Sequence, residues 1–179
     1  MRKTIGFEEL PFEDFKKIGF DRSQVLQLKQ ELIYLMTFRR TNLLEIKHPN
    51  RNQTLMAKLS LEMNDGQVVQ LLIHPVLNRM KNSFNLNQNE VRKIRDGGVI
   101  IQEELVGDKE NVYVIQRDND TNEMLRLDLS AINIDFSEKQ MKQLKAKGNV
   151  DLVGEKLIID LSKPEGFILI PNESDIDND

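Results

Sequence analysis

The alternation of apolar and polar residues along the chain predicts short antiparallel strands between short helices. Residues 55–63 alternate well, and the turn residues Asn64-Asp65-Gly66 join them to a second apolar strand over 68–73. This pattern is typical of a β-hairpin that rests one face on a core. Similar stretches separated by turn residues predict further strands at 43–46, 99–105, 111–116, 124–129, 150–153, 156–161 and 167–170.

One helix pattern occurs three times. In each copy a capping residue is followed three positions later by Gln or Glu, and then by two apolar residues spaced i and i+3. The capping residues are Asp21, Asn87 and Ser137. Their side-chain oxygens can accept from the unpaired N–H groups of a first helical turn, and the Gln or Glu completes a capping box. Gly98 and Gly148 are expected to end the later two helices, whereas the first is expected to continue to about Thr37.

These elements predict an α+β chain of three repeats, each a capped helix followed by a three-stranded antiparallel meander. One extra helix is expected at the N-terminus, over residues 10–19. The predicted units are 1–75 (a helical hairpin with its meander), 76–133 and 134–171, and the last two are expected to pack together. The acidic, polar tail 172–179 is predicted to be disordered.

Composition narrows the class of protein. With 179 residues, 39% of them hydrophobic and 30% charged, the chain is expected to fold as one or two small soluble domains. We find no apolar run long enough to span a membrane and no signal peptide, so we predict a cytoplasmic location. Cysteine is absent, which excludes disulfides and thiolate chemistry. The net charge of −4 provides no general attraction to nucleic acid.

Motifs for catalysis are missing. His48 and His74 both precede proline, lack the spacing of metal ligands, and are interpreted as residues held in extended backbone. The run Asp118-x-Asp120-x-Asn122 lacks the glycine and the final acidic residue of a calcium loop, so we interpret it as a polar hairpin turn. The chain has no phosphate-binding loop and no nucleophile elbow. We therefore predict no enzyme activity, catalytic residue, cofactor, metal or small-molecule substrate.

Clustered basic residues are the candidates for contact with nucleic acid or with another partner. A basic surface can hold a phosphate backbone, although ordinary solvated faces are the simpler interpretation. With eight Phe, two Tyr and no Trp, and with Phe38 alone beside a basic pair, base stacking is barely indicated. The candidate residues are Arg39, Arg40, Lys47, Arg51, Arg79, Lys81, Arg92, Lys93 and Arg95.

A protein partner needs a different surface. The edges of the predicted sheets are one candidate. An apolar patch formed by Leu32, Leu35, Met36 and Phe38 is another, with a place in the core as the equal alternative.

Several segments resemble known families. The runs 10–15 (LPFEDF), 39–44 (RRTNLL) and 73–76 (IHPV) resemble an uncharacterised domain family found in proteins of Bacteroidetes mobilisable and conjugative elements. The segments 86–90, 113–123 and 136–148 resemble a second uncharacterised family often found beside the first. Neither family has a known reaction, so the resemblance implies a genomic neighbourhood of DNA mobility and no catalytic residue.

Taken together, these features predict a non-enzymatic interaction module. A protein-binding accessory subunit, linked to a mobile-element or defence-related nucleoprotein complex, is the first hypothesis. The alternative is an accessory protein that binds nucleic acid through a basic surface without reading its sequence.

Overall fold

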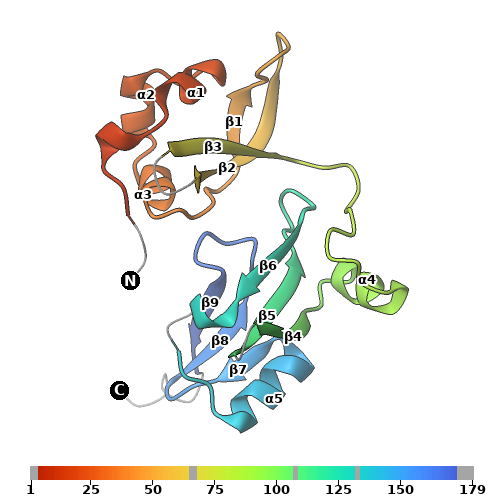
Figure 1. The fold of residues 1–179 in the computed structure, drawn as a ribbon. Coiled ribbons are helices and arrows are strands. Elements are labelled where there is room, and N and C mark those ends of the chain that lie inside the picture. The colour runs from red at the N-terminus through yellow and green to blue at the C-terminus, as the bar shows by residue number, and fades with distance from the viewer. Residues whose placement is uncertain (1–3, 65–67, 107–108, 132–133, 173–179) are drawn as a thin grey trace. The chain divides into compact units, whose positions relative to one another are not determined.

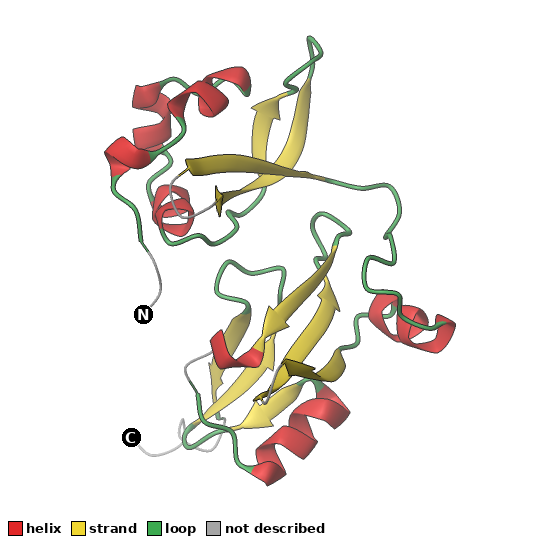
Figure 2. Ribbon diagram, in the orientation of Figure 1, coloured by secondary structure: helices red, strands yellow, loops and turns green. Residues whose placement is uncertain are grey.

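The computed structural model describes residues 4–64, 68–106, 109–131 and 134–172. The chain divides into two compact units, Met1–Leu77 and Asn78–Asp179 (Figure 1). The described ranges contain five α-helices and three antiparallel sheets of three strands each, as Figure 2 shows, which confirms the α+β class. Within these ranges no helix has both the length and the apolar character needed to cross a membrane. Of the predicted tail, all but Asn172 lies outside the described residues.

The N-terminal unit places short helices against one face of a meander (Figure 1). Its helices are η1 (Phe7–Glu9), α1 (Phe12–Lys17), α2 (Arg22–Gln27) and α3 (Gln30–Met36), and its strands are β1 (Leu44–Lys47), β2 (Thr54–Asn64) and β3 (Val68–Pro75), in the order β1-β2-β3. Helix residues Phe15, Val25 and Leu35 share one buried cluster with Ala57 and Leu59 of β2. The alternation along β2 therefore forms the core face that the sequence predicts.

The predicted long helix over 21–37 is wrong in one respect, because it is broken into α2 and α3. Lys29, between them, has a positive φ of 52°, which ends the first helix and redirects the chain. Val25 in α2 and Leu35 in α3 are nevertheless both fully buried. The apolar stripe continues across the break, so two short helices cover the small sheet in place of one long one.

The C-terminal unit contains two meanders. Sheet β4-β5-β6 consists of β4 (Ile100–Val106), β5 (Lys109–Arg117) and β6 (Met124–Asp128), and sheet β7-β8-β9 of β7 (Asn149–Asp151), β8 (Glu155–Ile159) and β9 (Phe167–Pro171). Helix α4 (Gln88–Arg95) precedes the first sheet, and η2 (Leu129–Ala131) and α5 (Glu138–Lys147) lie between the two.

Sheet β4-β5-β6 is covered on both faces. On one face, Ile100, Ile115 and Met124 pack with Ile94 of α4. The side chains at the intervening strand positions point to the other face. They belong to a larger cluster that includes Val114 from β5, Leu144 from α5, and Val150 and Leu157 from the last sheet. The predicted units 76–133 and 134–171 therefore share one core.

A buried side chain also links the two meanders of this unit. The Gln116 amide oxygen accepts from the backbone N–H of Leu161 at 2.8 Å, and its Nε2 donates to the carbonyl of Ile159 at 3.4 Å. Buried backbone groups need such partners, because leaving one unpaired costs free energy. Gln116 thus supplies, from β5, the hydrogen bonds that β8 lacks where it ends.

All three capping boxes are present. Asp21, Asn87 and Ser137 each accept from the backbone N–H three positions on, and Gln24, Glu90 and Gln140 return the hydrogen bond. Gly148 ends α5 in the left-handed conformation, with φ of 70°. At the end of α4 this role belongs to Gly97, with φ of 84°, and not to Gly98. The N–H of Gly98 instead donates to the Lys93 carbonyl at 2.8 Å and closes the last turn.

Candidate functional site

The basic residues of the C-terminal unit gather on and just before α4. The segment 78–95 contains Arg79, Lys81, Arg92, Lys93 and Arg95, with Glu90 as its single acidic residue. All five basic side chains are exposed. Positive charge is therefore concentrated locally in a chain whose net charge is negative.

The packing of α4 explains this arrangement. Ile94 is fully buried against the sheet and Val91 packs beside it, so the residues between and after them face outward. The carboxylate of Glu90 accepts from the backbone N–H of Asn87 at 2.9 Å as part of the capping box. The single acid of the segment thus serves the first turn of α4, while its three basic residues lie in the last turn, where they also suit the helix dipole.

Two surface hollows border α4. The first, of about 490 Å³, is lined by Asn89, Arg92, Lys93, Asp96 and Gly98, so that a carboxylate shares it with two cations. The second, of about 340 Å³, is lined by Asn78, Arg79, Met80, Arg95, Arg117 and Asn122, and Arg is the sole charged residue type in its lining. We call this second hollow the arginine pocket.

The sequence reasoning identified Arg79 and Arg95 but missed the third arginine of the arginine pocket, Arg117, and its three uncharged residues. Arg117 ends β5, and one of its terminal nitrogens donates to the side-chain oxygen of Asn119 at 3.2 Å. Its Nε is buried and has no hydrogen-bond acceptor among the described residues. A basic residue at the end of a strand is visible in the sequence, but its approach to Arg95 depends on how α4 packs on β5.

The remaining candidates belong to the N-terminal unit. Lys47 and Arg51 are exposed, whereas Arg39 and Arg40 are half-buried. Lys58, another basic residue of this unit, is 1% exposed and does not contribute to a charged surface. These residues lie outside the arginine pocket.

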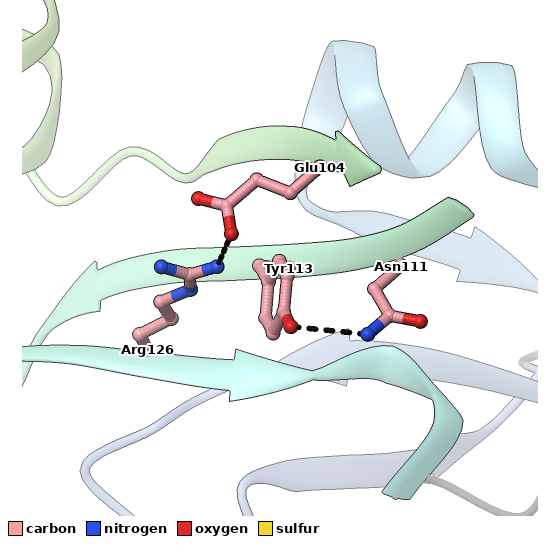
Figure 3. Close-up of polar contacts among 4 residues, drawn as sticks. All are labelled: Glu104, Asn111, Tyr113 and Arg126. Carbon is pink, nitrogen blue, oxygen red and sulfur yellow. Dashed lines mark hydrogen bonds and ion pairs between the residues drawn. The ribbon is translucent and has the colours of Figure 1, made fainter. Parts of the chain in front are cut away.

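Beyond the residues that pack against α4, the same face of sheet β4-β5-β6 carries the one described arginine that lies directly over a tyrosine ring (Figure 3). The Arg126 guanidinium lies 3.5 Å from the ring centroid of Tyr113 and forms an ion pair with Glu104. The hydrogen bond to Glu104 raises the pKa of Arg126 above its ordinary value. Asn111 donates to the Tyr113 hydroxyl at 3.2 Å. One face of Tyr113 is therefore occupied by Arg126, which leaves less ring for stacking on a base.

The apolar patch considered for protein binding belongs to the core. Leu32 and Leu35 are 8% and 0% exposed, and Met36 and Phe38 pack against the same cluster. The amphipathic helix that carries these leucines turns them towards the sheet, so the interpretation as a docking patch is wrong. Exposed apolar side chains occur elsewhere, on the edge strand β9, where Ile170 is 44% exposed.

A serine and a histidine meet on the hairpin of the N-terminal unit. The Ser60 hydroxyl and His74 Nε2 are 2.8 Å apart, on neighbouring strands β2 and β3. His74 stands opposite Lys58 in the register, so Ser60 lies diagonally across from it. Such diagonal pairs are common in antiparallel sheets, and this one gives the buried hydroxyl of Ser60 a partner.

The side chain of Asp118 is hydrogen-bonded to the backbone of its own turn. The Asp118 carboxylate accepts from the N–H groups of Asp120 and Thr121, at 2.9 and 3.3 Å, as in an Asx turn. Among the residues that the structure describes, no group of three or more His, Cys, Asp or Glu is placed to hold a metal ion.

Comparison with known proteins adds a family for the first part of the chain. No curated protein and no solved structure matches the chain. A family match covers residues 6–85, which include the N-terminal unit and the start of the basic segment with Arg79 and Lys81. The resemblance of the later segments to a second family, and the link to mobile elements, stay predictions. Residues 6–85 contain a domain of the family described as Protein of unknown function (DUF4099).

Proposed function

We propose that the chain is a non-enzymatic interaction module whose C-terminal unit binds the phosphate backbone of nucleic acid. The observation that carries this proposal is the local excess of positive charge at α4: five exposed basic residues against one acid within residues 78–95. That acid, Glu90, is hydrogen-bonded into the helix cap. The next acid, Asp96, follows the last turn and lines a hollow with Arg92 and Lys93, so positive charge stays in excess at α4.

Binding of this kind is electrostatic. Lys and Arg that neutralise phosphates release condensed counterions, so affinity falls steeply as salt is raised. Phosphate contacts position a protein on nucleic acid without reading the bases. The Arg126 guanidinium covers one face of the Tyr113 ring. Because base stacking requires an open aromatic ring, this arrangement favours contact with phosphates over stacking on bases.

The test compares two double variants that remove equal charge. Arg92→Gln with Lys93→Gln changes the α4 surface, and Lys139→Gln with Lys142→Gln changes exposed residues of α5. Fluorescence anisotropy with single- and double-stranded DNA and RNA, at two salt concentrations, measures affinity and its salt dependence. We expect the α4 variant to bind more weakly and to lose up to about one unit of salt slope per lost contact, while the α5 variant stays close to the unmodified chain. Equal loss in both variants, or no binding by the unmodified chain at low salt, would contradict the proposal.

A protein partner is the second candidate, and the edge strand β9 favours it. Leu169 and Ile170 are 41% and 44% exposed at the open edge of sheet β7-β8-β9. An unpaired edge with apolar side chains can accept a strand from another protein. If this edge is used, Ile170→Lys is expected to abolish capture of a defined partner, whereas Lys163→Gln, outside the strand, is expected to leave capture unchanged. Retention of the partner by Ile170→Lys would exclude β9 as the interface.

A further inference from the structure

The arginine pocket draws its side chains from separate parts of the C-terminal unit. Asn78, Arg79 and Met80 precede α4, Arg95 is the last residue of α4, Arg117 ends β5, and Asn122 belongs to the turn after it. Met80 also packs against the cluster that joins α4 to the sheet. The pocket is therefore attached to the core of the unit, and its volume of about 340 Å³ falls in the range of about 300–1,000 Å³ that is usual for ligand sites.

All charged residues in the lining of the arginine pocket are basic. Three guanidinium groups provide fixed, planar sets of N–H donors suited to the oxygens of a phosphate. Among the described residues, no carboxylate forms an ion pair with Arg79 or Arg95. One terminal nitrogen of Arg117 donates to the side-chain oxygen of Asn119 at 3.2 Å, and no described carboxylate forms an ion pair with Arg117 either. An anion in the pocket would supply the charge partner that the three arginines lack.

We infer that the arginine pocket binds the terminal phosphate of a nucleic-acid strand. The inference rests on the proposed function, and it distinguishes a chain end from the continuous backbone. A terminal phosphomonoester carries about −1.5 to −2 charges at pH 7, whereas each internal phosphodiester carries about one. Three arginines in the lining of one pocket favour the more highly charged group. A local pocket, unlike a long groove, also suits an end better than a passing strand.

The experiment uses the full chain and one single-stranded DNA sequence in three forms: with a 5′-phosphate, with a 3′-phosphate, and with hydroxyls at both ends. We expect one of the phosphorylated forms to bind about tenfold more tightly than the unphosphorylated form. Because the second pKa of a phosphomonoester is near 6, we expect this preference to shrink below about pH 6. Equal affinity of the three forms would overturn the inference and leave the proposed backbone binding intact, whereas no binding of any form would remove both.

Two matched variants of the same helix locate the effect. Arg95→Gln removes a cation from the pocket, and Arg92→Gln removes one a turn earlier, outside it. We expect Arg95→Gln and Arg79→Gln to abolish the preference for the phosphorylated end, and Arg92→Gln to weaken all three DNA forms alike. A phosphoserine peptide is tested as a competitor of the labelled phosphorylated DNA. If it displaces that DNA at a lower concentration than unlabelled 5′- or 3′-phosphorylated DNA does, the inference is overturned in favour of a phosphoprotein ligand. Retention of the preference in Arg95→Gln and Arg79→Gln, shown by circular dichroism to be folded, would also overturn it.

Discussion

The backbone of Gly148 lies so close to Val99 that a Cβ at position 148 would be 2.7 Å from Cγ2 of Val99. Gly148 also has a φ of 70°, which side-chain-bearing residues rarely adopt. We expect Gly148→Ala to lower the free energy of unfolding by about 2–4 kcal/mol, the sum of a conformational cost and of overpacking. Gly97→Ala is the matched control, since Gly97 has a φ of 84° with open space around it. Its cost is expected to be about 1–2 kcal/mol. Equal costs in urea denaturation would show that the contact with Val99 adds nothing.

Leu144 and Lys142 occupy opposite faces of α5. Leu144 is fully buried in the core that joins the two C-terminal meanders, and Lys142 is exposed. We expect Leu144→Ala to destabilise the chain by about 2–5 kcal/mol through lost burial and a cavity, and Lys142→Ala to be nearly neutral. Thermal melts of the two variants test this, and similar melting temperatures would refute the assignment of the faces.

The ion pair between Glu104 and Arg126 is partly open to water, with side chains 43% and 26% exposed. We therefore expect a small coupling, of about 0.2–1 kcal/mol, even though Arg126 also lies over Tyr113. A double-mutant cycle with Glu104→Gln and Arg126→Gln measures it in denaturant. A coupling well above this range would indicate that the cluster is more rigid than a surface pair.

The cap of α2 predicts a pH effect. The backbone N–H of Gln24, and then the Ser23 hydroxyl, lower the pKa of Asp21 below its ordinary value. A lowered folded-state pKa means that the carboxylate favours folding above its unfolded pKa of about 3.9. This contribution is lost as the pH falls through the folded-state pKa. An NMR titration is expected to give Asp21 a lower midpoint than aspartate in an unfolded peptide, and Ser23→Ala is expected to raise it. An unchanged midpoint in Ser23→Ala would leave the backbone N–H as the sufficient cause.

Local signals in the sequence predicted most of the secondary structure. Capping boxes are short-range chemistry, so Asp21, Asn87 and Ser137 identify three helix starts without knowledge of the fold. Alternation likewise identifies β2, whose apolar residues form the core face. Gly98 and Gly97 show the limit, because either glycine satisfies the sequence pattern and the packing of the last turn decides between them.

Features that depend on tertiary packing were not predictable. The break at Lys29 has no glycine or proline to indicate it, and the apolar stripe runs through it unchanged. Leu32 and Leu35 read equally well as a docking patch or as core until the sheet beneath them is known. The joining of Arg117 to Arg79 and Arg95 in one pocket combines segments that only the packing of α4 on β5 brings together.

The hydrogen bonds of Gln116 carry a consequence for folding kinetics. They join residues 43 and 45 positions apart, and so give the C-terminal unit contacts of long sequence separation. Such contacts are slow to form, because the entropy of closing the loop is lost before the contact is gained. During synthesis, the hydrogen bond between Gln116 and Leu161 can form only after Leu161 has left the ribosome. The N-terminal unit, by contrast, is already complete at Leu77. The nascent chain is therefore expected to hold one folded unit while the other still exposes apolar strands, and this interval is when it most needs a chaperone.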